Sequence, residues 1–136
     1  MLKIRYKFSL FYISSSHNKE VANINSQYHR VVVTGIGAIT PLGLDMATNW
    51  ENLIAGKSGV GYITLFDASK MEVKIAGEVK GFDPNNYINR KDIRRMDRFA
   101  QLAVAAGFQA VKDANLKIDD SNKDDIGVFI GSGIAV

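Results

Sequence analysis

Residues 30–43 of the chain read RVVVTGIGAITPLG, and this stretch carries the strongest structural signal in the sequence. Three consecutive valines at 31–33 are typical of a strand that is buried on both faces of a parallel sheet. Gly35 and Gly37 then interrupt the run, because glycine tolerates backbone conformations and close approaches that other residues do not. We therefore predict a buried strand that ends in a tight glycine turn.

A valine-rich strand followed by Gly-x-Gly also suggests a dinucleotide-binding turn, in which a helix N-terminus holds a pyrophosphate. The third glycine of that motif would stand at position 40, where the chain has Thr40. The acidic residue expected about twenty positions further on has no clear counterpart in residues 57–66. We favour a turn that serves packing, and an NAD(P)-binding Rossmann domain remains an alternative.

The next segment predicts a helix. Asp45 can cap its N-terminus, its apolar residues recur at helical spacing to about Ala55, and Gly56 fits the position just past its end. Beyond it, short strands or extended loop are expected around residues 62–66 and 73–79, and a turn at 83–86.

The longest periodic segment extends from about residue 89 to 114. Its many alanines predict a buried helix that neighbouring elements approach closely. A polar loop at 119–122 follows, and alternating apolar residues at 126–130 predict a second strand. Strand, helix, long helix and strand in this order indicate an α/β fold with a parallel sheet.

Composition narrows the possible functions. The chain has 136 residues, of which 46% are hydrophobic and 23% charged, as in one globular unit. Residues 1–30 carry five basic residues and one acidic residue, whereas residues 31–136 carry twelve basic and thirteen acidic residues. Because the body is close to neutral, nucleic-acid binding has little support. No apolar stretch reaches the roughly 18 residues of a spanning helix, so we expect no membrane association.

Cysteine is absent, which removes thiolate ligands and cysteine nucleophiles from these residues. The two histidines, His17 and His29, have no partner at metal-ligand spacing, so we predict no metal site. Ser132 has no histidine base in the body of the chain, and we interpret it as a small turn residue.

Residues 1–29 differ in texture from the rest, because they are rich in Ser, Asn and aromatics and carry no acidic residue before Glu20. We interpret them as an extension: a transit peptide, a disordered segment or the product of a wrongly chosen start codon. At the other end, the apolar pattern is still strong at Val136. Residues 30–136 are therefore expected to form an incomplete domain.

The collinear series RVVVTGIGAITPLG, Trp50, AGKSG, FDASKMEVKIAGEVKGFDP, RKDIRRMDRFAQLAVAA and IGVFIGSGI resembles the amino-terminal part of the β-ketoacyl-acyl-carrier-protein synthases, most closely the type II elongating enzymes. The resemblance covers residues 30–136. It implies part of the amino-terminal half of a thiolase-like, layered α/β/α/β/α fold. It also implies a homodimeric acyltransferase that needs no cofactor. We expect a cytoplasmic protein, or one in an organelle matrix if residues 1–29 are a transit peptide.

The chemistry that this resemblance implies is decarboxylative condensation of an acyl-enzyme with malonyl-ACP. A cysteine thiolate carries the acyl chain, and two histidines stabilise the enolate and the oxyanion. The family places these residues and a lysine after the GSGI segment, so none is expected within residues 1–136. The fragment is expected to be inactive, and a non-catalytic module that binds acyl-carrier protein is the second alternative.

Two features of the resemblance fall within the chain. Lys91, Arg94 and Arg95 match the positions at which the family binds the acidic acyl carrier protein, and we predict that role for them. The alternative without a binding role is that these cations form the solvated start of a helix, although cations at a helix N-terminus oppose the helix dipole. Ile134 matches the isoleucine that gates the acyl pocket at the subunit interface.

Overall fold

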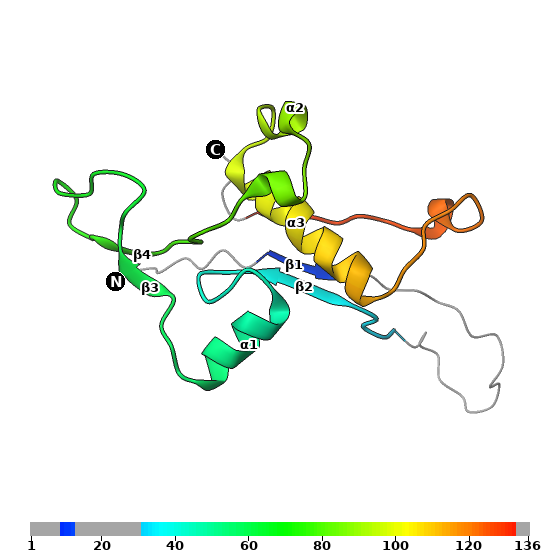
Figure 1. The fold of residues 1–136 in the computed structure, drawn as a ribbon, viewed down its shortest axis with the longest axis horizontal. Coiled ribbons are helices and arrows are strands. Elements are labelled where there is room, and N and C mark those ends of the chain that lie inside the picture. The colour runs from blue at the N-terminus through cyan, green and yellow to red at the C-terminus, as the bar shows by residue number, and fades with distance from the viewer. Residues whose placement is uncertain (1–8, 13–30, 133–136) are drawn as a thin grey trace.

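The computed structural model describes residues 9–12 and 31–132 (Figure 1). Two small antiparallel sheets and three helices make up its regular structure, together with two short 3-10 turns. In chain order these elements are β1 (Ser9–Tyr12), β2 (Ile36–Ile39), α1 (Met46–Ile54), β3 (Val60–Tyr62), β4 (Ile75–Gly77), the 3-10 turn Pro84–Asn86, α2 (Arg90–Ile93), α3 (Arg98–Asp113) and the 3-10 turn Lys123–Asp125. The α/β class predicted from the sequence is confirmed.

The core lies where α3 packs along β1 and β2. Strands β1 and β2 pair in antiparallel register, with Ser9 opposite Ile39 and Tyr12 opposite Ile36. The side chains that are buried between the elements are small, apart from two isoleucines. They are Ala38, Ile39, Ile88, Ala103, Ala105, Ala106 and Ala110. This confirms the prediction that the alanine-rich helix is approached closely by its neighbours.

The parallel sheet predicted for the two apolar stretches is wrong for the described residues, because both sheets there are antiparallel. Strand β2 begins at Ile36 rather than at the valine run predicted to be a buried strand, and the valines at 31–33 are exposed. Residues 126–130 form no strand, and Val128, Phe129 and Ile130 are exposed. A β-branched run indicates suitability for a sheet, but the composition alone does not decide which segments pair.

The predicted helix after residue 45 is confirmed as α1. The Asp45 side chain accepts a hydrogen bond from the Thr48 amide at 2.8 Å, and Gly56 adopts a φ of 66° just past the end. The apolar side of this helix is not buried by described residues, since Trp50, Leu53 and Ile54 are all exposed.

The single helix predicted for residues 89–114 is wrong in its first part, because the structure divides it into α2 and α3. Each helix has its own N-cap residue with extended backbone, Asn89 for α2 and Asp97 for α3. Short polar side chains favour N-cap positions over helix interiors, so Asp97 marks a second start within the periodic pattern.

The middle of the chain agrees in outline with its prediction. Strands β3 and β4 pair as a small sheet with Val60 opposite Gly77, and the predicted turn at 83–86 contains the 3-10 turn Pro84–Asn86. Strand β1 was not anticipated, because it lies within residues 1–29, which the sequence assigns to an extension. Within the described residues, no helix is long and apolar enough to cross a membrane.

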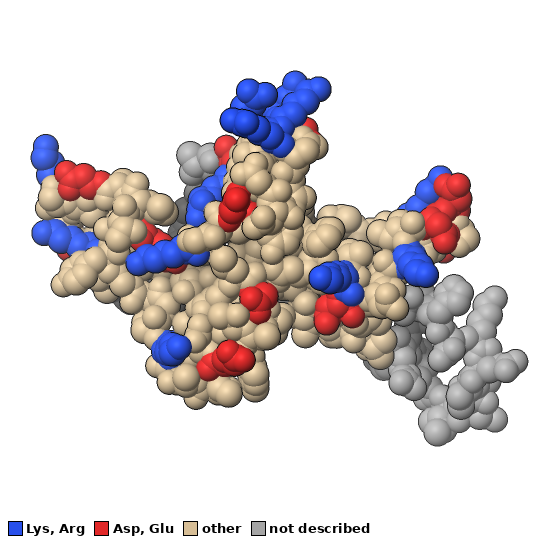
Figure 2. Space-filling model, viewed as in Figure 1, with Lys and Arg blue, Asp and Glu red and all other residues tan. Residues whose placement is uncertain are grey.

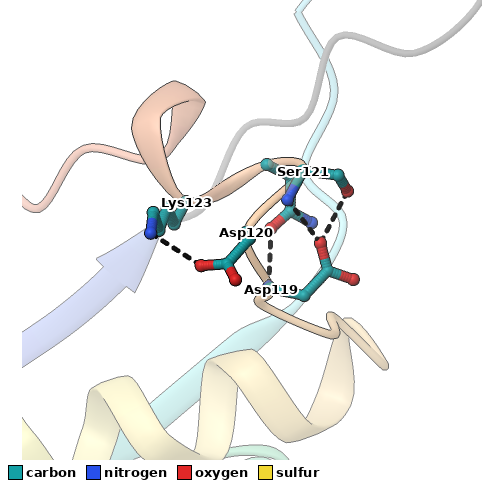
Figure 3. Close-up of polar contacts among 5 residues, drawn as sticks. Asp119, Asp120, Ser121 and Lys123 are labelled. Atoms are coloured by element: carbon teal, nitrogen blue, oxygen red, sulfur yellow. Dashed lines mark hydrogen bonds and ion pairs between the residues drawn. The ribbon is translucent and has the colours of Figure 1, made fainter.

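The polar loop predicted at 119–122 is present and is held by its own side chains (Figure 3). The Asp119 carboxylate accepts hydrogen bonds from the amide and the hydroxyl of Ser121, at 2.8 and 2.6 Å. These bonds lower the pKa of Asp119. Lys123 pairs with Asp120 at 2.6 Å on the exposed surface. Among the described residues, no group of three potential ligands could hold a metal ion.

Candidate functional site

Helix α2 is short, and its start is fixed by two side chains that cap each other. The Asp92 amide donates to Asn89 Oδ1 at 3.0 Å, and the Asn89 amide group donates back to Asp92 Oδ2 at 2.5 Å. This is a reciprocal arrangement of the capping-box type. The Asp92 carboxylate, which accepts this hydrogen bond from Asn89, forms no ion pair with another described residue.

Four cations surround this turn, namely Arg90, Lys91, Arg94 and Arg95, and we refer to them as the basic cluster. All four are exposed, and Figure 2 shows blue side chains gathered over α2 at the top of the view. Within the described residues, none of their side chains forms a hydrogen bond or an ion pair with another residue. The structure thus brings together the three cations predicted from the sequence, and it adds Arg90.

The basic cluster is anchored to α3 through Gln101. Its amide group donates to the carbonyls of Ile93 and Met96, at 3.2 and 2.9 Å, and so fixes the connection between α2 and α3. Arg98 is not part of the cluster, because its guanidinium donates to the Val79 carbonyl at 2.8 Å. This hydrogen bond and the Phe82 ring, whose centroid lies 5.9 Å from the guanidinium carbon, hold Arg98 against the body of the domain.

The glycine pair of the first strand packs against a helix and forms no phosphate loop. A Cβ placed on Gly37 would collide with the Ala106 carbonyl oxygen, and it would lie 2.8 Å from the Ala110 amide nitrogen. These atoms belong to the middle of α3, whereas a phosphate site needs the free amides of a helix N-terminus. The predicted close packing at the two glycines is confirmed, but the predicted tight turn at the end of a strand is wrong, because β2 (Ile36–Ile39) continues through Gly37 and the packing partner is α3.

The loop that follows β2 is held by a buried asparagine that the sequence did not single out. Asn49 donates to the carbonyls of Gly43 and Asp45, at 2.9 and 2.7 Å, and accepts a hydrogen bond from the Thr40 hydroxyl. Thr40 and Gly43 are also joined by two backbone hydrogen bonds. The only sequence feature that could have indicated this role is a polar residue in the middle of the predicted helix, in the segment TNWEN.

Gln109 is the second residue that sequence reasoning missed. From the centre of the molecule it accepts a hydrogen bond from the Ala38 amide at 3.3 Å and donates to the Leu44 carbonyl at 2.7 Å and to the Tyr87 hydroxyl at 3.2 Å. One side chain on α3 therefore joins β2, the loop after it and the segment before α2.

Glu78 is a buried carboxylate, but its contacts give it a structural role. It accepts hydrogen bonds from the Thr64 amide at 3.0 Å, from the Thr64 hydroxyl at 2.7 Å and from the Leu65 amide at 3.1 Å. The two Thr64 hydrogen bonds are the main reason that the pKa of Glu78 is lowered. A carboxylate that is satisfied in this way stays ionised and is unsuited to proton transfer.

The other sequence predictions lie at the C-terminal end. Ile134, the predicted gate of an acyl pocket, lies outside the described residues. Ser132 is exposed, and no histidine lies within the described residues to act as its base. Among the described residues, the feature predicted from the sequence that the structure brings together is the exposed basic cluster at α2.

The sequence and the fold of this chain are similar to those of a known protein family. The family model described as beta-ketoacyl synthase, N-terminal domain, matches residues 28–135. The chain is 50% identical over 110 residues to "3-oxoacyl-[acyl-carrier-protein] synthase 2" of Synechocystis sp., covering 81% of this chain and 26% of that protein. A protein of the same name from Staphylococcus aureus is 50% identical over 109 residues, covering 80% and 26%. The chain thus spans about a quarter of the length of the curated relatives it matches.

The fold agrees with these sequence matches. A solved structure, "The ishigamide ketosynthase/chain length factor", superimposes with a TM-score of 0.57 at 38% identity. That superposition covers 62% of this chain and 21% of the other. Since the family match extends over most of the chain and includes β2, α1 and α3, the chain belongs to the beta-ketoacyl synthase family, in its N-terminal domain.

Proposed function

We propose that this chain is the amino-terminal part of a 3-oxoacyl-acyl-carrier-protein synthase, an acyltransferase of fatty acid elongation. The observation that carries the proposal is its 50% identity to two proteins of that name, over most of the described fold. The complete protein would condense an enzyme-bound acyl group with malonyl-ACP, with loss of carbon dioxide. By the same resemblance it would act as a homodimer in the cytoplasm.

Residues 1–136 would supply only some of the functions of such a complete protein. They include no cysteine, and their histidines stand only at 17 and 29. The nucleophile and the imidazoles that the reaction needs would therefore come from other residues. The part described here would supply the fold around β2 and α3 and a surface for the carrier protein.

We assign that surface to the basic cluster. Residues 90–98 carry five cations and two carboxylates, and one of those carboxylates, Asp92, is engaged by Asn89. Exposed cations without partners attract an acidic protein over several ångströms and accelerate its association. Lys91 lies in α2, and Arg94 and Arg95 follow directly after its last residue, Ile93, so the three cations are carried by one short segment.

Charge reversal tests this assignment. Lys91→Glu and Arg94→Glu are each expected to weaken binding of an acyl carrier protein about three- to tenfold, as for exposed interface charges. The loss should become smaller as the salt concentration rises. Lys117→Glu is the matched control, because Lys117 is an exposed lysine outside the cluster. Equal Kd values for all three variants, measured by surface plasmon resonance, would refute the docking role.

The catalytic proposal is tested by the coding sequence and then by activity. We expect the reading frame beyond Val136 to encode a cysteine followed by two histidines. The complete protein should then form 3-oxoacyl-ACP and release carbon dioxide from malonyl-ACP. A stop codon directly after Val136 in an intact gene would refute the enzyme. Together with retained binding of the carrier protein, it would favour a non-catalytic binding module.

The nucleotide alternative receives no support from the geometry. Gly37 faces the middle of α3 and Gly35 faces its C-terminal end, and α1 begins nine positions beyond Gly37, at Met46. Titration with NAD or NADP is expected to produce no binding signal.

A further inference from the structure

The segment that carries the basic cluster is too short to fix its own position. Helix α2 has four residues, whereas an isolated helix needs roughly 12–15 residues to be even marginally stable in water. Arg94 and Arg95 follow in the connection to α3. The mutual capping of Asn89 and Asp92 joins two residues of this same segment and cannot orient it. Its orientation must therefore come from contacts with the rest of the domain.

Gln101 provides such a contact from α3. Its backbone amide donates to the Asp97 carbonyl at 3.1 Å, so it lies in the first turn of the helix. Its side-chain nitrogen reaches back across the connection and donates to the carbonyls of Ile93 and Met96, at 3.2 and 2.9 Å. Carbonyls at a helix end lack partners within their own helix, and the two hydrogens of one amide group can serve both.

The two carbonyls stand on either side of the arginines of the connection. Ile93 directly precedes Arg94, and Met96 directly follows Arg95. The two arginines are exposed, whereas Ile93, Met96 and Gln101 are half-buried. One uncharged side chain therefore holds both ends of the backbone stretch from which two of the four cations project. Helix α3 in turn packs along β2, which gives this stretch a fixed reference.

We propose that Gln101 is a positioning residue for docking of the carrier protein. It holds the backbone of Arg94 and Arg95 in the orientation in which the basic cluster meets an acidic partner; this rests on the docking role proposed above. Attraction at long range depends on the number of charges, and Gln101 contributes none. Tight contact at short range requires ordered groups, because binding otherwise has to order them. Gln101 therefore acts on the lifetime of the complex and leaves its rate of formation unchanged.

The test is Gln101→Leu in the full chain, which removes both hydrogen bonds while nearly keeping side-chain volume and net charge. Its Kd for an acyl carrier protein, measured by surface plasmon resonance, should rise about three- to tenfold, as for the loss of one or two hydrogen bonds. The rise should lie in the dissociation rate, with the association rate and its salt dependence unchanged. Lys91→Glu should instead slow association and weaken its salt dependence.

Gln109→Leu is the matched control, because it is the same substitution on the same helix. Its hydrogen bonds go to Ala38, Leu44 and Tyr87, outside α2 and its connection, and Tyr87 also stays in contact with the rings of Phe82 and Phe108. This variant should keep the original Kd under conditions in which circular dichroism shows every variant to be folded. An equal rise in both glutamine variants would mean a general loss of stability and would overturn the proposal.

Amide hydrogen exchange reports on position without any partner. The amides of Arg95 and Met96 donate to the carbonyls of Asp92 and Ile93. Their exchange should accelerate roughly fivefold in Gln101→Leu, as for the loss of about one net hydrogen bond, and should not change in Gln109→Leu. Unchanged exchange at both amides in Gln101→Leu would overturn the proposal.

A double-variant cycle separates this proposal from the docking role. In an Arg94→Glu/Arg95→Glu chain, Gln101→Leu should cause no further loss of affinity, because it acts through those two arginines. An additional loss of the same size would overturn the proposal. If Lys91→Glu weakens binding and Gln101→Leu does not, the docking role stands and the positioning role is refuted. If neither changes the Kd, the docking role fails, and the positioning role fails with it.

Discussion

Replacing Gly37 with alanine tests the close contact between β2 and α3, on which the core depends. The new Cβ would collide with the Ala106 carbonyl oxygen and lie 2.8 Å from both the Ala110 amide nitrogen and the Gln109 Cβ. Overpacking an interior costs about 1–3 kcal/mol. Since two of these three atoms are backbone and cannot rotate away, we take the upper end. Alanine restricts the unfolded chain and returns about 0.4–1 kcal/mol. The free energy of unfolding should therefore fall by about 2 kcal/mol.

The assay is urea unfolding followed by far-ultraviolet circular dichroism, which reports on α3. Gly61→Ala is the matched control, because Gly61 also lies in a strand but nothing stands within 4 Å of its added Cβ. That control should be as stable as the original chain or slightly more stable. If both variants unfold at the same urea concentration, the contact between β2 and α3 does not restrict the size of the side chain at position 37, and the reasoning is refuted.

Three further predictions follow from the polar contacts. Gln109→Leu should lower the free energy of unfolding by about 1 kcal/mol in urea titrations, because it leaves partly buried backbone partners without their hydrogen bonds; an unchanged midpoint would contradict this. Hydrogen bonds from Thr48 lower the pKa of Asp45, so its ionised form stabilises the fold fully above the ordinary aspartate pKa, and this contribution disappears as the pH falls through the lower, folded value. In the Asp45→Asn variant that part of the pH dependence of stability should be absent, and an identical pH profile would count against it. Glu78→Gln should accelerate hydrogen exchange at the Thr64 amide, and in the original chain the same acceleration should appear at acidic pH; equal rates in both chains would show that the carboxylate does not hold the loop.

Local signals predicted α1 well. Asp45 and Gly56 mark its two ends by side-chain capping and by a positive φ, and both effects act within a few residues of the helix. The division between α2 and α3 was also readable in principle, because Asp97 is a typical N-cap residue. It was missed because the apolar periodicity continues across the break. A helical period indicates which residues can share a face, but not whether the helix is continuous.

Sheet pairing could not be predicted in the same way. The partner of β2 lies in residues 9–12, a segment whose composition indicated an extension. Pairing between distant segments depends on which edges remain available after the helix has packed, and a strand pattern alone does not contain that information. The valine run and residues 126–130 both have strand composition, yet neither is part of β1 to β4 in the described residues.

For the candidate site, the sequence and its resemblance named Lys91, Arg94 and Arg95, and the structure shows that they are exposed and close together on one turn. Their role in binding remains a prediction. Asn49 and Gln109 were missed because their importance comes from tertiary hydrogen bonds, which connect residues that are far apart in the chain. Neither amide side chain has a distinctive local pattern.

The contact between β2 and α3 also governs how the domain can move. Most of the side chains buried between β2 and α3 are alanines, which have no rotamers, so this interface becomes ordered with little loss of rotameric entropy and offers few alternative packings. Strand and helix must therefore shift together as one rigid body. Any displacement imposed on the basic cluster by a bound protein has to be absorbed at residues 94–97, between α2 and α3, or be passed along α3 to the loop that begins at Thr40.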